Sequence, residues 1–249
     1  MKNKQMTLAG SGFEKYAKTT RRAQFLSEMD RIVPWRELCE LIAPVYPVAG
    51  NGRPPRELEM MLRIYFLQQW FNLSDPQAED ALYDSESMRR FAGIELGEEP
   101  VPDESTLLRF RHLLERHRLT ERLFAEVRTL LEERRLLLRS GTIVDATIIA
   151  APSSTKNAKR RRDPQMKPTK KGSQWYFGMK LHVGTDSRGR VHSVAVTDAA
   201  QHDSTQLPAL LHGQESALYG DRAYWNEWHW RCAREAGVRY RVKIGRAHV

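Results

Sequence analysis

The stretch Ser140-Gly-Thr-Ile-Val-Asp-Ala-Thr-Ile-Ile149 separates two parts of the chain that differ in character. Its β-branched residues predict a strand over 142–149, and the nearly continuous apolar run predicts that this strand is buried in a sheet. Asp145 is the single charged residue of the strand. Burying a carboxylate in a strand costs free energy unless the carboxylate is paired or binds a metal. Asp145 is therefore the first candidate for a catalytic or metal-binding residue.

Downstream of this strand the sequence predicts a mixed α/β domain. The segments 175–183 and 190–197 alternate like strands on either side of the turn signal Asp186-Ser-Arg-Gly189, which predicts a β-hairpin. Asp221 directly follows a short apolar run and is the second candidate acid. The elements predicted after the hairpin are a helix over 203–211, a strand over 215–219, a helix over 225–236 and a strand over 238–243.

Upstream of the dividing stretch, residues 1–139 are predicted to be entirely α-helical. Leu58, Met61, Leu62 and Tyr65 follow the i, i+3, i+4, i+7 spacing of an amphipathic helix. Ser74-Asp-Pro76 and Pro102-Asp-Glu-Ser105 are start signals for two further helices. The predicted divisions are a partly helical lead-in, a helical domain, a mixed α/β domain and a tail, at 1–52, 53–139, 140–243 and 244–249.

The two acids suggest a shared metal site. Mg²⁺ binds few carboxylates, keeps several waters and takes its other ligands from phosphate oxygens. Two ions about 4 Å apart can clamp an in-line displacement at a phosphodiester. The alternative is structural, since a lone aspartate in a strand is more often a cap or the partner of an arginine.

The positive charge of the chain is concentrated in one segment. The 249 residues are 41% hydrophobic and include 40 Lys and Arg against 31 Asp and Glu, a net charge of +9. Residues 151–180 hold nine of the basic side chains and one acid, so the rest is nearly neutral. Prolines and a glycine interrupt this segment and predict a loop. Its one-sided charge favours contact with phosphates, although charge runs are usually only a solvated surface.

Cysteine usage and hydropathy exclude other classes of protein. Cys39 and Cys232 lie far apart and outside any CxxC pair, which excludes a disulfide scaffold or a zinc ribbon. No run of about 18 apolar residues predicts a membrane span, and the polar start does not resemble a secretory signal. The sequence therefore predicts a cytoplasmic protein with no membrane partner.

Many long motifs resemble those of IS5-family transposases, in the same order along the chain. In the helical part they are Leu62-Arg-Ile-Tyr-Phe-Leu-Gln-Gln-Trp70, Asn72-Leu-Ser-Asp-Pro76, Glu79-Asp-Ala-Leu-Tyr83, Pro102-Asp-Glu-Ser-Thr106 and Leu108-Arg-Phe-Arg-His112. In the second part they are Val144-Asp-Ala-Thr-Ile148, Ala151-Pro-Ser-Ser-Thr-Lys-Asn157, Lys171-Gly-Ser-Gln-Trp-Tyr-Phe-Gly-Met-Lys180 and Tyr219-Gly-Asp221. The resemblance implies an α+β protein, in which an all-α, helix-turn-helix-like DNA-binding domain precedes an incomplete RNase H-like mixed α/β domain with a DDE active site.

The resemblance places the family's first two acids on Asp145 and Asp221, as catalytic residues and ligands of two Mg²⁺ or Mn²⁺ ions. The third acid, a glutamate, is expected on a helix beyond the end of the chain. Residues 244–249 do not resemble the family and are expected to be a non-native tail. We therefore expect a C-terminally truncated DDE transposase of the IS4/IS5 superfamily, with little or no catalytic activity.

Further residues are candidates for contact with DNA. Arg109 and Arg111 are predicted on the exposed side of a helix, where they would suit a groove-reading helix or simply be solvated. Trp225, just after Asp221, is a candidate to stack an unpaired base, although most such tryptophans pack in a core. The basic residues of the charged segment that we assign to DNA are Lys156, Lys159, Arg160, Arg161, Arg162, Lys170, Lys171 and Lys180.

The function implied is that of a bacterial insertion-sequence transposase. It would bind terminal inverted repeats and target DNA as a homo-oligomer in a synaptic complex at the nucleoid, and catalyse metal-dependent cleavage and strand transfer. One alternative is a nuclease or resolvase on the same RNase H-like fold, which would cleave DNA without strand transfer. Another is a non-catalytic DNA-binding inhibitor of transposition.

Overall fold

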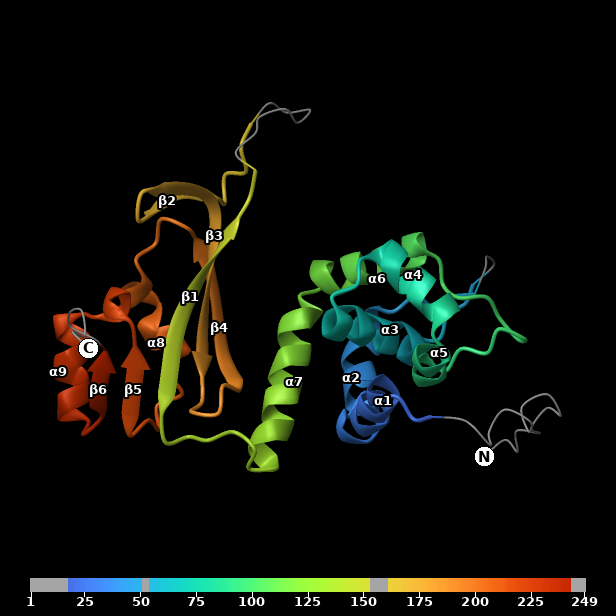
Figure 1. Cartoon of the computed structure of the whole chain (residues 1–249), viewed down its shortest axis with the longest axis horizontal. Coiled ribbons are helices and arrows are strands. Elements are labelled where there is room, and N and C mark those ends of the chain that lie inside the picture. The colour runs from blue at the N-terminus through green and yellow to red at the C-terminus, as the bar shows by residue number, and fades with distance from the viewer. Residues whose placement is uncertain (1–17, 51–53, 153–160, 243–249) are drawn as a thin grey trace. The chain divides into compact units, whose positions relative to one another are not determined.

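The structure is a computed structural model that describes residues 18–50, 54–152 and 161–242. The chain divides into two compact units, the first ending at Thr129 and the second beginning at Leu130 (Figure 1). Three of the predicted DNA contacts, Lys156, Lys159 and Arg160, lie outside the described residues, as does the tail 244–249.

The first unit is helical, as the sequence predicts. Ser74 forms a capping box with Gln77 in front of one predicted helix, so that each side chain binds the other residue's backbone N–H. Asp103 caps another, and hydrogen bonds from Ser105 and Thr106 lower its pKa to about 2. The helices are α1 (Arg21–Ile32), α2 (Trp35–Ile42), the 3-10 turn η2 (Ala43–Val45), α3 (Leu58–Phe71), α4 (Asp75–Asp84), α5 (Glu86–Ala92), α6 (Glu104–Arg116) and α7 (Leu119–Glu133), whose last residues enter the second unit.

One apolar core joins the helices of the first unit. The rings of Trp35 and Phe91 meet edge to face within it, with centroids 5.6 Å apart. Arg63 lies over both rings, at 4.5 and 5.1 Å, and its guanidinium pairs with Asp30 at 2.6 Å. This half-buried arginine therefore links α1, α2, α3 and α5, which explains why a basic residue stands within the apolar stretch of α3.

Among the described residues, the second unit forms a six-stranded mixed sheet. β1 is antiparallel to β3 and parallel to β5, and the sheet order is β2-β3-β1-β5-β6, with β4 paired to β3. The elements are β1 (Thr142–Ala150), β2 (Lys167–Lys171), β3 (Gln174–Thr185), β4 (Val191–Asp198), the 3-10 turn η3 (Asp203–Gln206), α8 (Leu207–Leu210), β5 (Ala217–Gly220), the 3-10 turn η4 (Arg222–Tyr224), α9 (Glu227–Glu235) and β6 (Arg239–Val242). The predicted hairpin is confirmed as β3 and β4.

The described part of the basic segment is more ordered than the predicted loop. Lys167–Lys171 forms β2, which pairs antiparallel with the start of β3 through a turn at Gly172, where φ is +62°. Pro168 is compatible with this strand because β2 lies at an edge of the sheet, where a missing N–H leaves no ladder bond unmade. Proline spacing alone therefore gave the wrong prediction for these five residues.

β1 is covered on one face only, which corrects the prediction of a buried strand. Thr142 and Val144 are buried, whereas Ile143, Asp145 and Ile149 are exposed. The apolar run concealed this alternation because apolar residues occupy positions on both faces of β1. The residues that pack with Val144 on the covered face are Leu207, Leu210, Leu218, Tyr224 and Val242.

Candidate active site

Asp145 and Asp221 lie on adjacent parallel strands and in register. β1 and β5 pair Thr142 with Leu218 and Ile143 with Tyr219, so continuing the same register places Asp145 opposite Asp221, one residue past the end of β5. The strands are tightly packed here, since a Cβ added to Gly220 would lie 2.9 Å from Val144. The sheet thus brings together the two acids that the sequence singles out.

Each of the two carboxylates binds one nearby backbone N–H and leaves its other oxygen accessible. Asp145 Oδ1 accepts from the N–H of Ala146 at 2.8 Å, and Asp221 Oδ1 accepts from the N–H of Ala223 at 3.0 Å. Both residues are exposed, and neither has an ion pair within the described part of the chain. The argument that burial demands a partner for Asp145 is therefore wrong, but the pair is open to a cation.

A buried tyrosine lies beside the two acids. Tyr224 is fully buried, and its hydroxyl lies 3.3 Å from Nδ1 of His182, which is also fully buried. Burial raises the pKa of the Tyr224 phenol and lowers that of the His182 imidazole. Three carboxylates raise the tyrosine pKa further, those of Asp203, Asp145 and Asp221. The tyrosine therefore stays neutral, and adds no charge to a site that already carries several acids.

Asp203 is a neighbour of the site that the sequence pattern did not identify. Its carboxylate accepts from Lys180 Nζ at 2.8 Å, and the same ammonium donates to the Gln201 carbonyl at 2.8 Å. The two side chains of the pair are 14% and 15% exposed. Lys180, which we predicted to contact DNA, is therefore engaged within the unit. Only the fold brings these residues together, because 23 positions separate them.

The site fits a divalent cation of the hard, oxygen-binding kind. Mg²⁺ is commonly held by one or two carboxylates, with waters and substrate phosphates as its other ligands. Asp145 and Asp221 supply such a pair. Within the described ranges no group of three or more His, Cys, Asp or Glu could hold a metal. Two glutamates near Asp221 in sequence have other partners, since Glu215 binds the His212 N–H at 2.7 Å and Glu227 pairs with Arg231 at 2.6 Å.

The described residues of the basic segment lie in the β2–β3 hairpin and just before it. Arg161 and Arg162 precede β2, and Lys170 and Lys171 form its end; all four are exposed. Their predicted contacts with DNA stay predictions, and their side chains are accessible for them.

Arg109 and Arg111 differ in their surroundings, although the sequence placed both on an exposed face. Arg109 is exposed, as predicted. Arg111 instead makes a bidentate pair with Asp75, from Nε to Oδ1 at 3.0 Å and from Nη2 to Oδ2 at 2.8 Å. The buried Gln68 donates to the same carboxylate at 2.8 Å. Arg111 therefore joins α6 to the first turn of α4.

Arg111→Met is expected to lower the free energy of unfolding by about 1–2 kcal/mol, because it leaves the half-buried Asp75 carboxylate without its arginine. Urea unfolding of the full chain measures this change. Arg109→Met is the matched control on the same helix and should change stability by less than about 0.5 kcal/mol. Equal stabilities of the two variants would contradict the structural role of Arg111.

The tryptophans after Asp221 are not core residues, contrary to the usual pattern. Trp225, Trp228 and Trp230 are 37%, 65% and 38% exposed, and α9 has no buried residue. Trp225 follows the single 3-10 turn that Asp221 caps, so it lies four positions after the acid, and it is accessible. Its assignment as a base-stacking residue stays a prediction.

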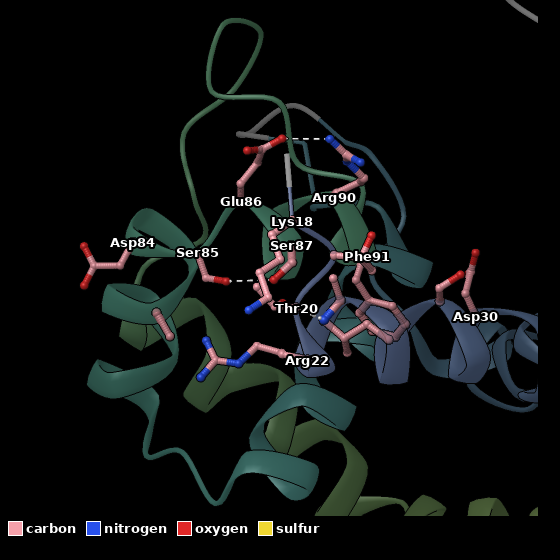
Figure 2. A pocket seen from close by; sticks show the side chains of 15 residues that line it. Lys18, Thr20, Arg22, Asp30, Asp84, Ser85, Glu86, Ser87, Arg90 and Phe91 are labelled. Carbon is pink, nitrogen blue, oxygen red and sulfur yellow. Dashed lines mark hydrogen bonds and ion pairs between the residues drawn. The ribbon is translucent and has the colours of Figure 1, made fainter. Parts of the chain in front are cut away.

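The first unit contains a separate pocket of about 880 Å³ at the start of α1 and around the junction of α4 and α5. Figure 2 shows Lys18, Arg22 and Phe91 among its lining residues, together with the pair that Glu86 and Arg90 form at 2.7 Å. Because acids and bases are both present, this pocket offers no one-sided surface to a polyanion.

Comparison with known families agrees with these two units. Residues 14–113 match the transposase domain family DUF772, and residues 136–247 match the transposase DDE domain family. The second unit is therefore an RNase H-like domain of a nucleic-acid-processing enzyme, and the α+β prediction is confirmed. The chain belongs to the DDE superfamily of transposases. No helix in the described part of the chain is long and apolar enough to cross a membrane.

Proposed function

We propose that this transposase binds the terminal inverted repeats of a bacterial insertion sequence and that Asp145 and Asp221 form its catalytic centre. The observation that supports the proposal is the register of β1 and β5, which, continued by two residues, brings the exposed Asp145 opposite the exposed Asp221. Within the superfamily the chain would be of the IS5 type, and it would act on DNA in the bacterial cytoplasm as a homo-oligomer.

Asp145 and Asp221 would hold a pair of Mg²⁺ or Mn²⁺ ions, whose chemistry is to stabilise the attacking and leaving oxygens of phosphodiester cleavage and transfer. The backbone bonds to Ala146 and Ala223 orient one oxygen of each acid. Tyr224 and His182 form a neutral, buried support behind them. The protein thus supplies fixed carboxylates, and its basic segment supplies affinity for the phosphate backbone.

A strand-transfer assay tests this function. The full chain is incubated with labelled inverted-repeat DNA and a supercoiled target, in Mg²⁺ or Mn²⁺ and in EDTA. Joining of labelled ends to the target, lost in EDTA, would support the catalytic assignment of Asp145 and Asp221 and would overturn the expectation from the sequence that this chain has little or no activity. Cleavage without joining would replace the proposal with a nuclease or resolvase. Binding without either reaction agrees with the little or no activity expected from the sequence, and metal binding by Asp145 and Asp221 then separates an inactive catalytic centre from a non-catalytic DNA-binding protein.

The DNA affinity should depend on salt through the basic segment. Each phosphate contact contributes about 0.9 to the slope of log K against log salt concentration on duplex DNA. Lys159→Gln combined with Arg160→Gln should therefore reduce this slope by about 1.8. Fluorescence anisotropy at several salt concentrations measures it.

The control for this experiment removes two arginines that stand in exposed i,i+4 ion pairs, Arg36 and Arg231. Replacing both with glutamine should leave the slope unchanged. If the control and the basic-segment variant reduce the slope equally, the affinity reflects general charge and the assignment of DNA contacts to residues 159 and 160 is wrong.

A further inference from the structure

We propose that the β2–β3 hairpin is a second DNA-binding element, in which Trp175 stacks on an unpaired base while Lys170 and Lys171 contact the adjoining phosphates. The inference rests on the proposed function, and it adds the form of DNA that this part of the protein recognises. The hairpin lies at the end of the sheet away from the β3–β4 turn (Figure 1).

Trp175 is placed for contact with a ligand and not for packing. It is 67% exposed, the largest exposed fraction among the tryptophans of the chain, and belongs to neither apolar core. The register pairs Trp175 with Lys170, whose Nζ lies 5.9 Å from the ring centroid. Lys171 is opposite Gln174 in the next pair. The exposed indole therefore lies beside Lys170, while Lys171 lies on the other face of the same two-stranded ribbon.

A pocket of about 390 Å³ adjoins this indole. The residues that line it include Trp175, Tyr176 and Phe177, and the Arg162 guanidinium lies 5.4 Å from the Phe177 ring centroid. Aromatic residues with cations beside them match the two parts of a nucleotide, since bases stack on rings and phosphates bind lysine or arginine.

The charge of the hairpin favours a nucleic acid over an apolar protein partner. Residues 161–175 contain five basic side chains and one acid, Asp163. Neither Lys170 nor Lys171 has an acidic partner among the residues that the structure describes. A protein surface that bound only the tryptophan would leave this charge unmatched, whereas the phosphates of a DNA strand match it.

The stacked base would not be the nucleotide at which the reaction occurs. Val183 pairs with Asp145, and Trp175 lies eight positions before Val183 on β3, which is roughly 26 Å in an extended strand. Because alternate residues of a strand point to the same side, Trp175 lies on the same face of the sheet as Val183 and its partner Asp145. The hairpin would therefore hold DNA that flanks the cleaved bond, while Trp225 remains the candidate beside Asp221.

The test measures binding of the full chain to a single-stranded thymidine oligonucleotide and to an inverted-repeat duplex that carries 2-aminopurine in a short single-stranded gap. Trp175→Ala should weaken binding of the oligonucleotide roughly 5- to 150-fold and abolish the quenching of 2-aminopurine. Trp175→Phe should restore most of the quenching, because an aromatic ring is retained. Lys170→Gln with Lys171→Gln should lower the salt slope on the oligonucleotide by about 1.4.

The control is Trp228→Ala, which removes an equally exposed tryptophan outside the hairpin and should leave quenching intact. Unchanged oligonucleotide binding and quenching in Trp175→Ala, with duplex binding intact, would overturn the hairpin proposal and leave the proposed function standing. A wild-type chain that binds the duplex but neither the oligonucleotide nor the gap would also overturn the hairpin proposal and leave the proposed function standing. A wild-type chain that binds no DNA at all would overturn both.

Discussion

Asp145→Asn and Asp221→Asn are each expected to lower the affinity for Mn²⁺ by at least about 100-fold and to abolish any metal-dependent cleavage or strand transfer that the chain shows. Loss of an outer-shell partner alone costs about 10- to 100-fold in metal affinity, and a direct anionic ligand contributes more. Asparagine keeps the shape of the side chain and an oxygen for the neighbouring backbone N–H, so the change is mainly one of charge. Titration calorimetry with Mn²⁺, in the presence of inverted-repeat DNA, measures the affinity independently of turnover.

Both variants should retain their affinity for DNA, because removing an acid takes away no phosphate contact. Asp84→Asn is the matched control, since Asp84 is an exposed aspartate of the first unit, and it should change neither metal affinity nor activity. If Asp145→Asn binds Mn²⁺ like the wild type, the aligned pair on β1 and β5 is not the metal site, whatever the activity of the chain.

Gly178→Ala is expected to destabilise the second unit by roughly 3 kcal/mol or more. The φ of Gly178 is +156°, and an added Cβ would lie 2.0 Å from the Ile149 carbonyl oxygen on β1. Backbone strain and overpacking each cost about 1–3 kcal/mol, and here they act at the same residue. Relief would require β1 and β3 to separate where they pair Ala150 with Gly178. Urea unfolding measures the stability, and hydrogen exchange of the β1 amides localises the loss.

Two other glycines separate the causes of this loss. Gly172 has a φ of +62° but open space around a new Cβ, so Gly172→Ala should cost only about 1 kcal/mol. Gly97 has neither a positive φ nor a close neighbour, and Gly97→Ala should be neutral within about 0.5 kcal/mol. A Gly178→Ala variant as stable as Gly172→Ala would show that β1 and β3 do not approach as closely as the structure has them.

Local signals in the sequence predicted much of the fold. The Ser74 cap, the helix after Asp103 and the β3–β4 hairpin all depend on neighbouring residues, and each occurs where it was predicted. The strand β2 was missed because its pairing with β3, and not its own proline-containing sequence, makes it a strand. The helix expected over 203–211 is reduced to η3 and α8, and His202 caps its start.

By itself, the sequence determined the helical and mixed α/β parts, the excess of positive charge in residues 151–180, and Asp145 and Asp221 as the candidate catalytic acids. The tertiary structure decided which face of β1 carries Asp145, that Asp221 stands in register with it, and that Arg111 and Lys180 form internal pairs with Asp75 and Asp203. Caps, turns and hydrophobic periods act over a few residues and can be read along the chain. Strand register and ion pairs between residues 23 or more positions apart depend on which segments the core brings together.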